Sequence, residues 1–522
     1  MHSGSFRKPN ILVFMADHYR GDMAPPYDRA YTPNLDRIAA SGTTFSRVYC
    51  TAPHCCPARA SFFTGLFPSR HGVWNNVGVA NALSHGLNDG VRMWSDDLLE
   101  AGYRLIYSGK WHVSMEESPE DRGWEMTSKN PAPSRKPFHV PFTEDWKVYS
   151  RDPGTLDTEE PAVLRRPGQI LRPGYPKYTL YGTLDHTGKG CLESTSRHAM
   201  IVRHDEQVIA QALSAIRSRG EDSRPWCHFV GTLGPHDPYW VPSEFLDLYD
   251  PKKIKLPDSF SDTMADKPNL YRRTRSRFDQ LRPEEHREAL QHYLAFCSYE
   301  DHLFGKILDA LKEQGELDDT LVIFTSDHGD YAGDHGLWAK GLPCFQGAYH
   351  IPLVMRWPEG IPAAGKIVDR MVSQVDFAPT LLDLLGLPGR TEYTGRSLLP
   401  WMKSASAAGA TVDTAWDAPE EIYTQTNGNE LYGIQRSVMT REWKYVYNGF
   451  DFDELYDLRK DPGERVNLAG DPKYGETVKD LMSRIWRFAY ENGDTCVNHY
   501  VMVSLAPYGP GIIFQDGERN GT

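Results

Sequence analysis

The sequence predicts an α/β protein: a large, mostly parallel sheet sandwiched by helices, then a smaller C-terminal antiparallel sheet with a helix. Short apolar runs without polar interruption are the first observation, because they are typical of strands buried on both faces. Helical periodicity between these runs is the second, since alternating strands and helices form α/β sheets. The third is a change near residue 420 to short segments of alternating polarity.

Five apolar runs are candidate strands of the large sheet. The clearest is residues 10–17, NILVFMAD, which ends in a carboxylate, and residues 321–327, LVIFTSD, repeat that pattern. Weaker runs lie at residues 103–107, 227–233 and 352–356. Their lengths favour strands over helices.

Two stretches between these runs have helical spacing. Residues 197–217 are rich in Ala, Ile, Val and Gln. In residues 283–314 many apolar side chains recur at intervals of three and four, which are the intervals of one helical face. Those side chains are Leu290, Leu294, Cys297, Phe304, Ile307, Leu308 and Leu311.

Changes in composition and in hydrophobic pattern divide the chain into parts. We expect a catalytic domain over residues 1–415, with an irregular Pro-, Gly- and Arg-rich insertion at 129–189, and such insertions often face substrate. A small α+β domain is predicted over residues 416–495. The apolar tail, residues 496–522, is expected to dock on its own body or on a neighbouring subunit. The small domain's predicted elements are strands at 421–425, 441–447 and 454–458 and a helix at 477–490.

Composition and charge exclude some classes of protein. The 522 residues are 40% apolar and 24% charged, which is ordinary for a globular chain. The net charge is −13, and an acidic chain is a poor partner for nucleic acid, whose phosphates need clustered Lys and Arg. An anionic substrate would therefore need a local positive pocket against the mean field.

Targeting signals and cysteine spacing give an expected compartment. No apolar segment typical of a signal peptide opens the chain, and no run approaches the ~18 residues of a membrane span. The eight Cys are scattered, apart from Cys55 and Cys56, and form no disulfide framework or zinc spacing. We expect a cytoplasmic protein with reduced thiols and no membrane partner, unless a signal peptide has been removed.

Polar side chains follow four of the predicted strands. Asp17 and His18 follow the first run, Lys110 and His112 follow residues 103–107, His236 follows residues 227–233, and Asp327 and His328 follow the run at 321–326. Ligands of open α/β sheets bind beyond the carboxyl ends of the strands. We therefore expect these groups to converge on one site.

Residues 55–65, CCPARASFFTG, carry the most specific motif. The pattern Cys-x-Pro-x-Arg followed by Thr-Gly resembles the modification motif of the type I sulfatases, which share the alkaline-phosphatase-like fold. The resemblance implies that a formylglycine-generating enzyme oxidises Cys55 to formylglycine. Its hydrate would attack the sulfate ester, and loss of a proton from its second hydroxyl would then expel sulfate. Taken alone, Cys55 would be a small buried hydrophobe.

The same resemblance implies one divalent metal ion. Its ligands would be Asp17, His18, Asp327, His328 and the modified Cys55. His stands where the sulfatases carry Asp and Asn, although His at the later position also occurs in phosphonate monoester hydrolases and choline sulfatases. Oxygen ligands suit Ca²⁺ and imidazole favours Mn²⁺, so both ions stay open. A single Asp–His pair would more often be a cap or a buried hydrogen-bonded pair.

Further roles follow from the resemblance. Arg59 would hold the hydrate, and Lys110 would bridge the hydrate and a sulfate oxygen. His112 would be the base that expels sulfate. His236 and Lys340 would contact the leaving-group oxygen, where Lys340 would neutralise developing charge. Taken singly, each has an equally good structural explanation.

Some neighbouring residues are weaker candidates. Asn76 is a candidate substrate contact. Asp330 and His335 are interpreted as structural residues that orient the Lys340 loop. Tyr239 and Trp240 either line the leaving-group pocket or pack in the core.

Three functional hypotheses remain from the sequence. A sulfatase acting on small-molecule aryl or alkyl sulfates is preferred, because Lys110 and His112 match the sulfatase pattern. A phosphonate monoester hydrolase or phosphodiesterase is the alternative, which His328 favours. A non-catalytic binding protein that never matures Cys55 is the third. The apolar tail favours a homodimer or homotetramer.

Overall fold

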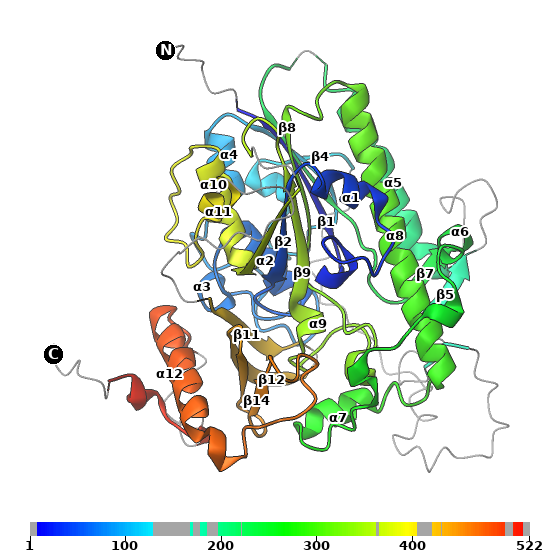
Figure 1. The fold of residues 1–522 in the computed structure, drawn as a ribbon. Helices are drawn as coiled ribbons and strands as arrows, with labels where there is room; N and C mark the ends of the chain where they lie inside the picture. Colours follow the sequence, from blue (N-terminus) through cyan, green and yellow to red (C-terminus); the bar gives the residue numbers. More distant parts are fainter. Residues whose placement is uncertain are drawn as a thin grey trace.

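The structure is a computed structural model of the chain (Figure 1). It describes residues 8–128, 167–170, 178–184, 197–220, 222–361, 365–403, 420–429, 431–495 and 505–514. Most of the predicted insertion at 129–189 lies outside these residues, as does much of the tail.

The main sheet has eight strands in the order β10-β2-β9-β8-β1-β6-β3-β4. Their bounds are β1 (Asn10–Ala16), β2 (Thr43–Tyr49), β3 (Arg104–Gly109), β4 (Glu125–Met126), β6 (Trp226–Gly231), β8 (Thr320–Ser326), β9 (His350–Arg356) and β10 (Lys366–Ser373). Strand β9 is antiparallel to both of its neighbours, and the other described pairings are parallel. The prediction of a mostly parallel α/β sheet is confirmed.

Adjacent residues of β1 show how the sheet is covered on both faces. Phe14 stacks on Phe324 of β8 and meets Phe304 of α8 edge-on. Val13 is paired with Phe229 of β6, which packs against Phe63 of α2 on the opposite face. Because successive side chains of a strand alternate between faces, an unbroken apolar run requires helices on both sides. Figure 1 shows α5 and α8 on one side of the sheet and α4 and α10 on the other.

The helices include the two that the sequence predicts between strands of the large sheet, α5 and α8, and the one it predicts near the C-terminus, α12. Their bounds are α1 (Pro33–Ala39), α2 (Cys55–Thr64), α3 (Pro68–His71), α4 (Trp94–Glu100), α5 (Met200–Arg217), α6 (Ser243–Leu246), α7 (Asn269–Arg275), α8 (Pro283–Glu313), α9 (Gln346–Tyr349), α10 (Phe377–Leu384), α11 (Leu399–Lys403) and α12 (Gly475–Glu491). Within the insertion range, Tyr181–Leu184 forms a short strand, β5, that pairs with β7 (Tyr239–Pro242).

The C-terminal region forms a separate four-stranded antiparallel sheet, as predicted. Its strands are β11 (Ile422–Gly428), β12 (Tyr432–Met439), β13 (Trp443–Asn448) and β14 (Glu454–Asp457). Helix α12 buries Leu481, Ile485 and Trp486 against this sheet. The described part of the tail lies on α12, where Trp486 Nε1 donates to the carbonyl of Tyr508 at 2.8 Å.

Strands β2, β10 and β12 escape the sequence-based prediction. Strand β2 has the sequence TTFSRVY. It lines the core, and its polar residues Thr43, Thr44 and Ser46 are buried there. Hydroxyl and charged residues interrupt the apolar pattern, so periodicity alone gives no signal there. Among the described residues, no helix has the length and apolar character needed to cross a membrane.

Candidate active site

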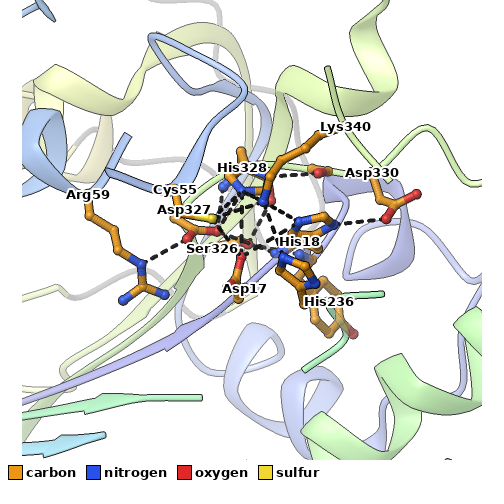
Figure 2. A network of polar contacts seen from close by, with 12 residues as sticks. Asp17, His18, Cys55, Arg59, His236, Ser326, Asp327, His328, Asp330 and Lys340 are labelled. Carbon is orange, nitrogen blue, oxygen red and sulfur yellow. Dashed lines mark hydrogen bonds and ion pairs between the residues drawn. The ribbon is translucent and has the colours of Figure 1, made fainter. Parts of the chain in front are cut away.

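Side chains from four segments meet at the carboxyl edge of the main sheet (Figure 2). Asp17 and His18 follow β1, and Asp327 and His328 follow its parallel neighbour β8. Strands β6 and β3 continue the same parallel set, which brings the loops after them to this edge. The convergence expected from the sequence is therefore present.

Cys55 is the first residue of α2 and is 2% exposed. Its Sγ lies 2.9 Å from Lys340 Nζ, 3.4 Å from His328 Nε2 and 3.8 Å from Asp17 Oδ1. Burial acts to raise the pKa of the Cys55 thiol, but Lys110 and Lys340 outweigh it and hold that pKa well below its usual range. The environment of this atom therefore strongly favours negative charge.

Four of the predicted ligands form a candidate metal site. One donor atom each of Asp17, His18, Cys55 and His328 lies within 4.8 Å of the others. Nδ1 of His18 faces Asp330 Oδ2 at 3.0 Å, and Nδ1 of His328 faces the carbonyl of Gly329 at 2.9 Å. Each contact places the proton on Nδ1 and leaves the Nε2 lone pair for a cation.

The positively charged side chain of Lys340 lies among these donor atoms. The Lys340 ammonium lies 2.5 Å from His18 Nε2 and 3.0 Å from His328 Nε2. Burial, with the nearby positive groups, lowers the pKa of His18 well below its ordinary value, so its imidazole is neutral. Imidazole nitrogens and the Cys55 sulfur thus already surround one cation, and with the nearby Asp17 carboxylate they form a donor set that suits a divalent metal ion.

Asp327 lies beside this donor set with its oxygens engaged. Oδ1 accepts hydrogen bonds from the backbone N–H groups of His18 and His328, at 3.3 and 2.9 Å, and lies 3.7 Å from His328 Nε2. Oδ2 accepts from Arg59 Nε at 2.9 Å. Asp327 thus also ties together the loops after β1 and β8 and the helix that carries Cys55.

Arg59 stands one helical turn after Cys55 and is fully buried. Its Nε is held by Asp327, and its Nη1 donates to the carbonyl of Lys110 at 3.0 Å. Its Nη2 has no hydrogen-bond partner among the described residues. The Lys110 ammonium forms an ion pair with Asp17 Oδ2. The Nη2 amino group of Arg59, with its two N–H bonds, therefore remains for a ligand.

Two histidines complete the surroundings of Cys55. Hydrogen bonds from His112 and His236 help to lower the pKa of the Cys55 thiol. Burial, and then Lys110, lower the pKa of His112, whereas that of His236 is raised because Asp237 and Asp17 outweigh burial and Lys340. The contrast favours a neutral base at His112 and a more readily protonated imidazole at His236.

Comparison with known proteins places this geometry in a family. A family model described as Sulfatase matches residues 9–387. The chain belongs to the sulfatase family. A second model, N-sulphoglucosamine sulphohydrolase, C-terminal, matches residues 333–491. Membership confirms the resemblance drawn from the Cys55 motif and places this sulfatase among the sulfuric ester hydrolases.

Named relatives of the sulfatase cover most of its length. A choline-sulfatase of Rhizobium meliloti is 29% identical over 480 residues, which are 89% of this chain and 83% of that protein. An arylsulfatase of Clostridium perfringens is 26% identical and covers 91% and 93%. The phosphonate monoester hydrolase of Agrobacterium radiobacter, at 23% identity, has the same fold, with a TM-score of 0.68 over 93% and 96% of the two chains.

Asn76 of this sulfatase lies in the site region but has structural contacts. Its Oδ1 accepts from the backbone N–H of Cys56 at 3.0 Å, which satisfies one free donor at the start of α2. The backbone N–H of Asn76 donates to Asn429 Oδ1 at 2.9 Å, so the turn after β11 braces the cap. The sequence carries no signal for this contact, because the two Asn are far apart along the chain.

Asp330, interpreted from the sequence as a residue that orients the Lys340 loop, accepts from the backbone N–H of Ala332 in that loop at 2.8 Å and also has contacts that the sequence does not indicate. Its Oδ2 faces His18 Nδ1 and accepts from the Tyr239 hydroxyl at 2.8 Å. Tyr239 is completely buried and supports the site from behind. His335 faces Asp262 at 2.8 Å instead of the reacting groups, in keeping with a structural role.

Backbone strain is concentrated at this sulfatase site. Of the seven non-glycine residues with positive φ in the described chain, five lie in the site loops. They are His18, His112, Ala332, His335 and Ala339. Such conformations cost of order 1–3 kcal/mol each and persist where surrounding contacts enforce them. The loops are therefore held in shape by the fold.

Proposed function

We propose that this sulfatase hydrolyses small aryl or alkyl sulfate esters with a formylglycine made from Cys55. The observation that carries the proposal is the position of Cys55 Sγ, 2.9 Å from Lys340 Nζ and within reach of the donor atoms of Asp17 and His328. A nucleophile at this point would meet an anionic ester in a positive pocket. That pocket offsets the acidic charge of the whole chain, −13.

One divalent ion, Ca²⁺ or Mn²⁺, would be held by Asp17, His18, Asp327, His328 and the modified Cys55. When bound, such an ion supplies Lewis acidity and lowers the pKa of a coordinated hydroxyl. The two imidazoles favour Mn²⁺. We expect Mn²⁺ to raise the melting temperature of chelator-treated protein more than Ca²⁺ does, and an equal or reversed ranking would contradict this assignment.

The matured residue supplies an aldehyde hydrate, whose two hydroxyls allow attack and later release of sulfate. The protein groups then have separate tasks. Arg59 and Lys110 hold the hydrate and a sulfate oxygen. His112, which is kept neutral, accepts the proton whose removal frees sulfate.

His236 and Lys340 would act at the leaving-group oxygen. Lys340 Nζ lies 3.5 Å from His236 Nε2, so one ester oxygen can meet both groups. The raised pKa of His236 favours donation of a proton to that oxygen. Poor leaving groups should therefore depend most on this pair.

Phosphonate monoester hydrolysis is the second candidate activity. His328 among the metal donors favours it, whereas Lys110 and His112 favour sulfate esters. Steady-state rates on a matched nitrophenyl sulfate and nitrophenyl phenylphosphonate separate the two. We expect kcat/KM to be higher on the sulfate, and a higher phosphonate value would reverse the assignment.

Maturation is tested directly by mass spectrometry of the tryptic peptide of residues 48–59. Co-expression with a formylglycine-generating enzyme should convert Cys55 to the aldehyde and leave Cys50 and Cys56 as thiols. A Cys55→Ala chain is the control and should show no aldehyde. An unconverted Cys55 under these conditions would favour a non-catalytic binding protein.

A further inference from the structure

Two carboxyl groups lie buried behind the loop that carries His236. Asp205 belongs to α5 and Glu300 to α8, and both side chains are completely buried. Within the described ranges, neither forms an ion pair with a Lys or Arg, and the one basic side chain at ion-pair distance from Asp205 is His204, at 2.8 Å. Two adjacent buried carboxyl groups without a strong cation are costly and require an explanation.

The side chain of Asp205 holds the loop that carries His236 through hydrogen bonds from the loop backbone. Its two oxygens accept hydrogen bonds from the N–H groups of Leu233 and Gly234, both at 2.8 Å. The Gly234 carbonyl in turn accepts from the N–H of Asp17 at 3.0 Å, and the N–H of His236 donates to the carbonyl of Leu233 at 3.1 Å. The position of His236 relative to Asp17 therefore depends on Asp205.

Glu300 packs against the same loop at Gly234. A Cβ at Gly234 would lie 2.1 Å from Glu300 Oε1, so the carboxyl packs directly on the glycine backbone. Neither oxygen of Glu300 meets the geometry of a hydrogen bond with a described residue, although the Thr232 hydroxyl lies close enough to oppose a rise of the Glu300 pKa. Burial raises the pKa of Glu300 well above its ordinary value, and the charge of Asp205 raises it further. A neutral carboxyl is a hydrogen-bond donor, and Asp205 is an adjacent acceptor.

We propose that Glu300 and Asp205 form a carboxylic acid–carboxylate pair that positions the His236 loop against the leaving-group oxygen. Glu300 keeps its proton and donates it in a hydrogen bond to Asp205, and Asp205 fixes the loop backbone. The pair touches neither substrate nor metal and is a positioning device. The titratable groups that face it are Asp17 at the end of β1, His204 on α5 and Cys297 on α8 itself. This inference rests on the proposed function of His236.

The test compares Glu300→Gln with Glu300→Ala. Gln is neutral, has the same shape and can donate to Asp205, so its rates should stay close to wild type. Ala removes the donor and opens a space behind Gly234. We expect a loss of ~10–100-fold in kcat on phenyl sulfate, and a much smaller loss on nitrophenyl sulfate, because a misplaced group of about 1 Å can cost ~10²-fold. Glu313→Gln, at the exposed end of the same helix, is the matched control.

A loss by Gln equal to that by Ala, or an Ala loss that is uniform across leaving groups, would overturn the proposal. If Glu300→Ala does not fold, the wild-type minus Glu300→Gln infrared difference spectrum decides whether Glu300 carries a proton. A band from a protonated carboxylic acid supports the pair, and its absence at neutral pH overturns it. A wild-type enzyme without sulfate ester hydrolysis would contradict the proposed function, while the infrared result would still decide the protonation of the pair.

Discussion

The active-site edge and the C-terminal sheet both bury positive side chains, but they balance them differently. In the small domain, Arg436 pairs with Asp494 at 2.5 Å and Lys444 with Glu464 at 2.7 Å, all at most 4% exposed at the side chain. At the active site, Lys340 faces three imidazoles and the Cys55 sulfur, and no carboxylate of the described residues lies within ion-pair distance. Its charge therefore has no carboxylate partner in the fold.

The difference separates two uses of buried charge. An ion pair closed within the fold has its desolvation cost offset by its own partner, so loss of one member leaves an uncompensated charge. At the site, Arg59 and Lys110 are paired with Asp327 and Asp17, whereas Lys340 meets an oxyanion only when an anionic ligand binds, and the strained loops around it add to this cost. Substitutions in the two regions should therefore separate stability from activity.

The largest effect is expected at the nucleophile. Cys55→Ala should reduce turnover by ~10⁴-fold or more, because no aldehyde can form. The free energy of unfolding should change by less than about 1 kcal/mol, since one small side chain is lost. Steady-state kinetics and urea unfolding measure the two quantities. Cys56→Ala is the control, and substantial turnover by the Cys55 variant would mean that the nucleophile is misassigned.

The next effect is one of stability alone. Arg436→Met should lower the free energy of unfolding by about 3–5 kcal/mol, because the buried Asp494 loses its cationic partner. The double substitution with Asp494→Leu should recover part of that loss. Urea unfolding followed by far-UV circular dichroism gives the values. Equal losses in the single and double variants would show that the charge is not the cause.

Lys340→Met should have the opposite effects, a large loss of activity and a small loss of stability. We expect kcat to fall by ~10²–10³-fold, because the group that neutralises the leaving-group oxygen is gone. The stability should fall far less than in Arg436→Met, since no closed ion pair is broken. Kinetics on aryl sulfates and urea unfolding are measured on one preparation. A stability loss equal to that of Arg436→Met would remove the distinction between the two regions.

A smaller, pH-dependent effect is expected at Asp453 in the small domain. Burial raises the pKa of Asp453 to about 6, although hydrogen bonds from Tyr445 and Asn448 oppose the rise. Because the folded-state pKa exceeds the unfolded one, its contribution is complete below about pH 4 and is lost as pH rises through 6. The loss is on the order of 2 kcal/mol.

Asp453→Asn tests this directly. The variant keeps an acceptor for Asn448 and has no titrating group, so the wild-type minus variant stability should fall between pH 4 and pH 7. Urea unfolding at several pH values gives that difference curve. A flat difference curve would show that Asp453 does not titrate in this range.

Much of the fold and several site residues can be predicted from sequence because they produce local signals. The runs that become β1 and β8 end in Asp17 and Asp327, and parallel strands bring such ends together. Cys55 is predicted from a motif of eleven residues. The supporting groups give no such signal: Asp205, Glu300 and Asn429 act through contacts with residues far away in the chain. Their roles depend on how helices and domains pack, which periodicity does not encode.

The brace between Asn76 and Asn429 has a consequence for biosynthesis. Asn429 is translated 374 residues after Cys55, and its contact completes the cap over the first turn of α2. At synthesis rates of about 5–20 residues per second, this interval lasts roughly 20–75 seconds. Until then the helix that buries Cys55 lacks its final support. The distance between two residues in the gene thus sets a minimum time during which the nascent thiol can be reached by a modifying enzyme.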